Sequence, residues 1–196
     1  MRTRLLTRLV LTGLALAACA TLTPAERESA GDAQRFLDET SRAYDVQKVT
    51  LMLGSANLGD AATIRPGGLV TMGHEYLAHP DVRDTLLAHE MAHLILGHMD
   101  RPPESRDVRE QREIDADVKS VEILRRVRGM SEARAFSFVT AYVLGLKRSL
   151  DKGGGRVNLM GHGHPCRKVE ALIKAYPRQQ SVLDRLQADP GLAKCP

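Results

Sequence analysis

Residues 89 to 98 read HEMAHLILGH, so three histidines and one glutamate stand in an otherwise apolar run. Polar groups of this kind are costly to bury unless a partner satisfies them. On a helix, His89 and His93 lie about 40° apart on one face, one turn above the other, so both imidazoles can reach one ion. Glu90 lies about 100° round from His89, close enough to contact a water on that ion. HExxH on a helix is typical of a zinc site whose glutamate acts as the general base.

The third histidine of this run, His98, is predicted not to bind the same ion. It falls in the apolar stripe nearly opposite, so we interpret it as a helix-end or hydrogen-bonded residue. A catalytic zinc site needs a third protein ligand and leaves its last position to water. In the pattern HExxHxxGxxH that ligand is a histidine, but the required Gly and His are replaced here by Leu96 and Met99.

The third ligand is therefore predicted on the next helix, in the segment REIDADVKS. Glu113 and Asp117 are four residues apart and share a helix face, whereas Asp115 points away. Twenty residues separate His93 from Glu113, enough for a turn and an antiparallel helix. We expect Glu113 to bind the metal and Asp117 to accept the free N–H of a ligating histidine. The alternative interpretation is a solvated acidic face on a charge-rich helix.

The elements that must position these residues are mostly helices. Apolar spacing predicts four long helices, over about residues 23–47, 80–99, 104–128 and 131–146. A helical hairpin follows Pro165 and is interrupted at Pro177. Between the first two helices, KVTLMLGS and ATIRPGGLVTMG predict two or three short strands, the second segment lying at a sheet edge or beginning after Pro66. The predicted fold class is α+β, with several helices against a small sheet.

The N-terminal residues predict export and a lipid anchor. A basic start precedes an apolar run over residues 9–18 that is too short to span a membrane. The letters LAAC at 16–19 resemble a bacterial lipobox, which implies removal of residues 1–18 as a signal peptide and lipidation of Cys19. An ordinary signal cleaved nearby, or an uncleaved anchor, is the alternative. Ala20 resembles an outer-membrane sorting signal, so we expect a periplasmic lipoprotein anchored in the outer membrane.

We expect residues 19–196, the exported chain, to form a single domain. The charge composition of this chain limits the classes of partner it can bind. Residues 1–18 hold three arginines and no acids, so their removal lowers the net charge from +4 to +1. A nucleic-acid partner thereby loses its electrostatic basis. No second apolar stretch approaches the roughly 18 residues of a spanning helix, which argues against an integral membrane protease.

Two cysteines remain besides Cys19. Cys166 and Cys195 form an even pair in an exported, oxidising compartment, which predicts a disulfide that ties the C-terminal tail beside His164. Two free buried thiols are the alternative.

Taken in order, these motifs resemble the HtpX-like family of gluzincin zinc metallopeptidases, which includes CAAX prenyl proteases and bacterial periplasmic peptidases. The matching elements are His89-Glu90-x-x-His93, then Glu113-x-x-Ala116-Asp117, then His164-Pro165. The resemblance implies a zincin-like fold with one Zn²⁺ per chain on His89, His93 and Glu113. It also implies that RPGGLVTMG is the edge strand lining the active-site cleft, where an extended substrate could add as one more strand.

The resemblance further implies that His164 and a basic companion assist at the cleft. The segment HPCRKVEAL is shorter than the family pattern, so Arg167 or Lys168 must stand in for the family's arginine. These groups would stabilise the developing oxyanion. The alternative for His164 is a merely solvated loop histidine.

The sequence thus predicts a zinc metalloendopeptidase that hydrolyses peptide bonds in exported or envelope proteins, including in protein quality control. Glu90 would take a proton from the zinc-bound water, whose hydroxide attacks the substrate carbonyl. The competing prediction is a zinc-binding lipoprotein that acts as an envelope assembly or chaperone module without proteolysis. Glu90 argues against it, because a structural zinc site fills all four positions with protein ligands and needs no base. The substrate, any gating partner and the oligomeric state stay open.

Overall fold

The structure is a computed structural model that describes residues 22–54, 61–100, 105–152 and 163–195. Cys19 and the expected signal segment 1–18 lie outside the described residues. The described strands are β1 (Thr50–Gly54), β2 (Ala62–Arg65) and β3 (Leu69–Gly73). The α-helices are α2 (Pro24–Tyr44), α3 (Pro80–Ile95), α4 (Arg106–Arg128), α5 (Glu132–Asp151), α7 (Pro165–Ala175) and α8 (Gln180–Ala188). Two short 3-10 helices are η2 (His74–Ala78) and η3 (Pro177–Gln179).

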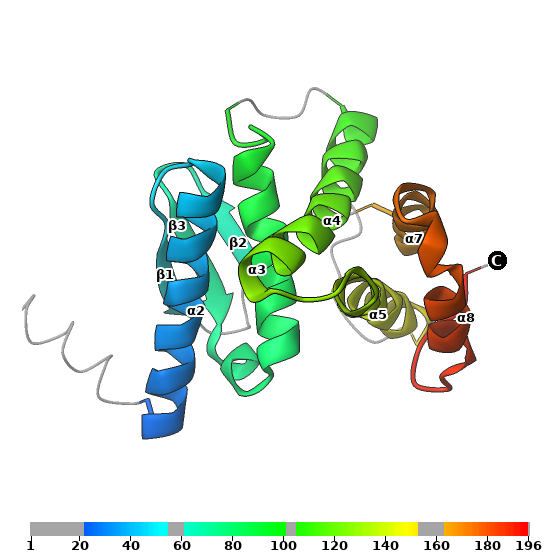
Figure 1. Cartoon of the computed structure of the whole chain (residues 1–196), viewed down its shortest axis with the longest axis horizontal. Coiled ribbons are helices and arrows are strands. Elements are labelled where there is room, and N and C mark those ends of the chain that lie inside the picture. The colour runs from blue at the N-terminus through cyan, green and yellow to red at the C-terminus, as the bar shows by residue number, and fades with distance from the viewer. Residues whose placement is uncertain (1–21, 55–60, 101–104, 153–162, 196) are drawn as a thin grey trace, which may run out of the picture.

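The elements form an α+β fold. Figure 1 shows α3 and α4 in the middle of the molecule, with α2 and the sheet on one side and α5, α7 and α8 on the other. The expected class, several helices against a small sheet, is confirmed. Among the described helices none is both long and apolar enough to cross a membrane.

Capping residues set most of the helix boundaries. The side chains of Thr23, Ser105 and Ser131 accept backbone N–H groups at the starts of α2, α4 and α5. Gly129 ends α4 in the left-handed conformation, directly after the predicted end of this helix at residue 128. The long helices therefore begin close to where the sequence signals place them, and α4 also ends where predicted.

Three predicted helix ends are wrong. Helix α2 ends at Tyr44 rather than near residue 47, and α5 continues to Asp151 rather than ending near residue 146. The third error, at the end of α3, matters for the site. Helix α3 ends at Ile95 rather than near residue 99. Gly97 has a φ of +68°, a left-handed conformation that glycine adopts without strain, and it turns the chain out of the helix. His98 consequently leaves the apolar stripe to which the helical wheel assigned it.

The sheet has the order β1-β3-β2, with β3 parallel to β1 and antiparallel to β2. The turn between β2 and β3 contains Gly67 and Gly68, both with positive φ. The expectation that RPGGLVTMG is the edge strand is wrong, because β3 lies within this segment and is paired on both sides. Among the described strands, the one at the edge of the sheet that faces α3 is β2.

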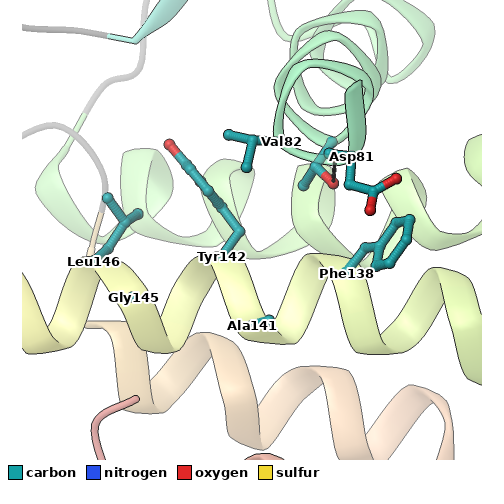
Figure 2. A pocket seen from close by; sticks show the side chains of 8 residues that line it. Asp81, Val82, Phe138, Ala141, Tyr142, Gly145 and Leu146 are labelled. Carbon is teal, nitrogen blue, oxygen red and sulfur yellow. Dashed lines mark hydrogen bonds between the residues drawn. The ribbon is translucent and has the colours of Figure 1, made fainter. Parts of the chain in front are cut away.

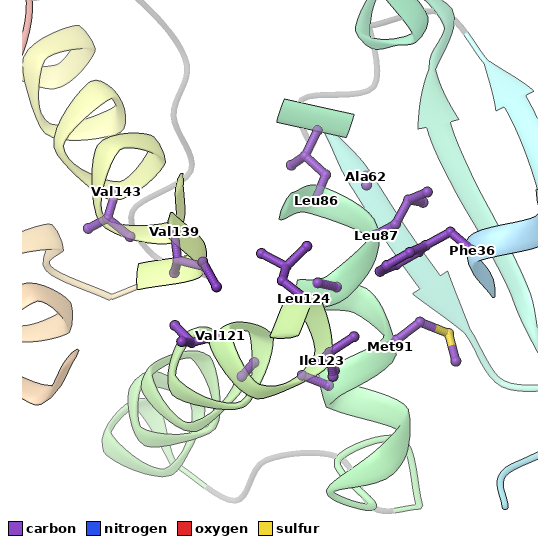
Figure 3. Close-up of a cluster of buried hydrophobic side chains, with 14 of the residues drawn as sticks. Phe36, Ala62, Leu86, Leu87, Met91, Val121, Ile123, Leu124, Val139 and Val143 are labelled. Carbon is purple, nitrogen blue, oxygen red and sulfur yellow. The ribbon is translucent and has the colours of Figure 1, made fainter. Parts of the chain in front are cut away.

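Helix α3 passes through the centre of the hydrophobic core. Leu87 and Met91 are fully buried and lie next to Phe36 of α2, while Ile123 and Leu124 of α4 are also fully buried (Figure 3). Burial of each such side chain typically contributes about 1.5–3 kcal/mol to stability. The apolar side of α3 is thereby fixed in the core, which turns the face carrying its histidines toward α4.

An ionic network holds three helices together at the N-terminal end of α3. Arg83 is only 3% exposed and binds both Asp32 of α2 and the neighbouring Asp84. Arg128, at the end of α4, contacts Asp84 at 2.7 Å and Asp32 at 3.0 Å. Burial opposes ionisation of Asp32, but Arg128 and Arg83 outweigh it and lower the pKa of this carboxyl.

The C-terminal region is tied down by a disulfide. Cys166 at the start of α7 is bonded to Cys195, 29 residues further along the chain. This is the pairing that the sequence predicts, and it fixes the tail next to the first turn of α7.

Candidate metal centre

Two helices bring the three predicted ligands together. His93 of α3 lies opposite Glu113 of α4, and His89 lies opposite Asp117, so the helices run antiparallel. The His89 Nε2 atom is 3.4 Å from Glu113 Oε2, and the His93 Nε2 atom is 3.3 Å from Glu113 Oε1. The two Nε2 atoms are 3.1 Å apart. His89, His93 and Glu113 form a group that can hold one metal ion.

These separations suit a small, tetrahedrally coordinated cation. Two ligand atoms at about 2.0–2.1 Å from such an ion stand about 3.3 Å from each other. The separations of 3.1 to 3.4 Å are close to this value, with His89 next to Oε2 of Glu113 and His93 next to Oε1. One atom from each residue lies within 4.8 Å of the other two, so the group can converge on one ion. The donor set, two imidazoles and one carboxylate, fits a site that leaves one coordination position open.

Asp117 supports one of the ligands, as the sequence predicts. Its Oδ1 atom lies 2.8 Å from the Nδ1 atom of His89. A proton held on Nδ1 leaves the Nε2 lone pair free for an ion. Burial opposes protonation of His89, but Asp117 and Glu113 outweigh it and raise the pKa of this histidine to about 10. Without an ion the imidazole is therefore protonated, and an ion must displace that proton.

His98 supports the other ligand, a role that the sequence analysis missed. Its Nδ1 atom lies 3.0 Å from the Nδ1 atom of His93. Burial, together with His93 and Arg112, lowers the pKa of His98 to about 4, so the ring is neutral near pH 7. A neutral His98 can accept the N–H of His93, which turns the Nε2 atom of His93 toward the ion. His98 is thus outside the ligand group, as expected, but in contact with it.

Glu90, the residue after His89, connects α3 to the sheet. Its carboxylate is buried and accepts a hydrogen bond of 2.7 Å from the backbone N–H of Ile64. Ile64 is in the middle of β2, so this N–H belongs to the edge of β2 that faces α3. The expected edge strand beside the site therefore exists, but it is β2.

The three residues predicted from the C-terminal motif have different environments. The His164 side chain is exposed and caps α7 by accepting the N–H of Cys166, while its own backbone N–H donates to Glu110. Arg167 is also exposed and pairs with Glu110 at 2.8 Å. Lys168 is 4% exposed and points toward the metal group. All three thus contact α4, but of these three only Lys168 reaches carboxylates of the site, whereas the other two contact Glu110.

Lys168 binds the two carboxylates on α4. Its Nζ atom is 2.9 Å from Asp117 Oδ2 and 3.6 Å from Glu113 Oε2. Burial opposes the charged form of the lysine, but Asp117 and Glu113 outweigh it and raise its pKa. Lys168 is therefore an ammonium that offsets the negative charge of a ligand and of the residue supporting it.

A second residue that sequence analysis missed is Tyr142 of α5. Its side chain is half-buried, and desolvation together with Asp117, Tyr76 and Glu90 raises the pKa of its hydroxyl. The phenol is therefore protonated and lies within electrostatic range of the site. The only signal in the sequence was a lone hydroxyl-bearing ring within FSFVTAYVLGL, a segment that reads as core.

No protein-family model, no curated protein and no solved structure matches this chain. The functional interpretation therefore depends on the geometry of the site.

Proposed function

We propose that this chain is a zinc-dependent metalloendopeptidase of the HtpX-like gluzincin type, with a zincin-like arrangement of two helices and a sheet edge. One observation carries the proposal: His89, His93 and Glu113 form a group that could hold one metal ion, and Glu90 follows the first of these ligands on the same helix. A structural zinc site would fill a fourth position with protein and would need no adjacent carboxylate.

When bound at this site, zinc would polarise a substrate carbonyl and bring the pKa of a bound water to about 7. Glu90 accepts the proton of that water on its carboxylate and later returns it to the leaving amine. The hydrogen bond from Ile64 holds one carboxylate oxygen of Glu90 in place during this transfer. Asp117 and His98 hold the ligand imidazoles in the tautomer that directs Nε2 at the ion.

The substrate in this proposal is an extended polypeptide. The outer edge of β2 offers backbone groups next to Glu90, and an extended chain could pair with such an edge. Lys168 keeps Glu113 oriented rather than contacting the oxyanion, because its ammonium is bound between two carboxylates. The role of His164 as a donor to the oxyanion stays a prediction. For this role the side chain would have to give up its contact with the backbone N–H of Cys166 at the start of α7.

We also propose that the protein is exported, loses residues 1–18, and is anchored to the outer membrane through a lipid on Cys19. The support is the order of basic, apolar and LAAC segments at the N-terminus. Its substrates would then be exported or envelope proteins.

The proposal is tested by metal analysis and proteolysis on the same preparations. The wild-type chain should hold one zinc per chain and cleave an unfolded protein in a chelator-sensitive manner. Glu113→Ala should lose both properties, whereas Glu90→Gln should keep zinc and lose cleavage. Glu122→Gln, on the same helix but bound to Lys119 and Tyr44, is the matched control and should keep both.

Two results would count against the proposal in different ways. If the wild-type chain holds no zinc, the proposed metal centre is refuted. Zinc binding with no cleavage of any unfolded protein would instead favour the non-proteolytic assembly or chaperone module.

A further inference from the structure

A buried ammonium lies beside the proposed metal centre. Lys168 of α7 is 4% exposed, and its Nζ atom lies 2.9 Å from Asp117 Oδ2 and 3.6 Å from Glu113 Oε2. Glu113 belongs to the ligand group, and Asp117 holds the ligand His89. The ammonium therefore contacts negative charges that a bound cation would also attract.

The group that faces these carboxylates from α5 is uncharged. Figure 2 shows the ring of Tyr142 extending away from the α5 backbone, with its hydroxyl at the far end. Burial, together with Asp117, Glu90 and Glu113, raises the pKa of this hydroxyl, so the phenol stays protonated. Tyr142 thus adds no charge to the centre. The ammonium that contacts both carboxylates of α4 comes from α7.

The position of Lys168 is fixed by the packing of its helix. Val169 and Leu172 of α7 are 3% and 0% exposed. The first turn of the same helix is held by the disulfide between Cys166 and Cys195. A cation that enters the centre therefore meets a positive charge that cannot withdraw.

The ammonium acts differently on the zinc-free and the zinc-bound protein. Without zinc it offsets two buried carboxylates, whose charges are costly when they lack a partner. With zinc bound, the two cations repel each other across the same carboxylates. Because Lys168 stabilises the zinc-free protein more than the zinc-bound protein, it must lower the affinity for zinc. This effect is opposite to that of Asp117 and His98, which orient ligands and strengthen binding.

We infer that Lys168 is a built-in counter-cation that keeps the affinity for zinc low, so that the zinc occupancy of this chain follows the supply of the metal. The inference rests on the proposed function and makes zinc supply the regulator of that activity. It also requires that the chain stays folded when the metal is withdrawn. A structural zinc site behaves in the opposite way, because its ion supplies folding energy and chelators unfold the protein.

The test measures the dissociation constant for zinc at pH 7, in competition with a chromogenic chelator. Lys168→Met should bind zinc roughly 10- to 100-fold more tightly than the wild type, because the repulsion is removed. Lys168→Arg keeps the positive charge and should keep the wild-type affinity. The matched control is Lys174→Met, which removes an exposed lysine from the same helix and should leave the affinity unchanged.

Thermal unfolding gives a second measurement that depends on neither proteolysis nor the competing chelator. Wild-type protein stripped of metal should stay folded by circular dichroism, and saturating zinc should raise its Tm. The rise should be larger for Lys168→Met, because zinc then replaces the missing counter-charge. A Lys168→Met chain that stays unfolded at saturating zinc overturns the inference, since the ion would then not replace the ammonium.

The outcomes separate this inference from the proposed function. A wild-type chain that binds no zinc refutes the proposed centre, and the inference fails with it. If the wild type binds zinc but Lys168→Met binds it equally or more weakly, the metal centre stands and the role of Lys168 alone is overturned. The role is also overturned if Lys168→Arg tightens binding as much as Lys168→Met, because charge would then not be the cause.

Discussion

The buried pair of Asp117 and Lys168 gives the sharpest test of the centre. Their charged atoms are 2.9 Å apart and the side chains are 3% and 4% exposed. Coulomb's law with an effective dielectric constant of about 20 gives an attraction of about 6 kcal/mol at this distance, part of which offsets desolvation. Removal of either partner leaves the other buried without its counter-charge, which typically costs about 3–5 kcal/mol.

We therefore predict strong non-additivity between Asp117→Asn and Lys168→Met. Each single substitution should lower the free energy of unfolding by about 3–5 kcal/mol, and the double mutant should recover about 3 kcal/mol relative to the sum. The assay is urea unfolding followed by circular dichroism, with chelator present so that metal affinity does not enter.

An exposed pair supplies the control for this cycle. Lys147 and Asp151 are 2.7 Å apart on α5, but the aspartate side chain is 54% exposed. Their coupling energy should be at most about 0.5 kcal/mol. If the Asp117–Lys168 cycle gives a value as small as this control, the two groups do not form a buried pair, and the assigned role of Lys168 is refuted.

Three further predictions concern the network, the disulfide and the second supporting histidine. Asp32→Asn should cost about 1 kcal/mol at neutral pH. Because the folded pKa of Asp32 is lowered, the difference from wild type should begin to shrink in acid unfolding curves near about pH 4 and vanish only below that lowered pKa. Cys166→Ser should lower the free energy of unfolding by about 2–4 kcal/mol, and a reductant should then have no additional effect on the variant's denaturation midpoint. His98→Ala should weaken zinc binding by about 10- to 100-fold in a competition titration with a chromogenic chelator, whereas unchanged affinity would show that His98 does not orient His93.

The ligand group could be predicted from sequence because it depends on helix periodicity alone. His89 and His93 must share a face of any helix that contains them, and so must Glu113 and Asp117. Once two such helices pack antiparallel, the four side chains meet. The prediction that these four side chains meet therefore required only the antiparallel order of the two helices and not their exact packing.

The surroundings of the centre could not be predicted, because they depend on contacts between distant segments. Lys168 reaches Asp117 only because α7 packs on α4, and no local pattern encodes that placement. The edge strand was misassigned because β1 pairs in parallel with β3, the second strand of the β2–β3 hairpin, which leaves β2 at the edge. The role of His98 was missed because a single residue, Gly97, ends the helical register.

Helix α3 uses one face for packing and another for its histidines, which explains how these polar side chains can lie inside a small domain. Leu87 and Met91 hold one side of the helix in the core, so its rotation is set without any contribution from the metal ligands. Packing therefore does not require His89 and His93 on the other face, and these two positions can carry metal ligands. Their polar neighbours must satisfy them in the absence of an ion, and Asp117 and His98 do so. The same hydrogen bonds orient both imidazoles, so the contacts that make burial tolerable also prepare the ligands for a cation.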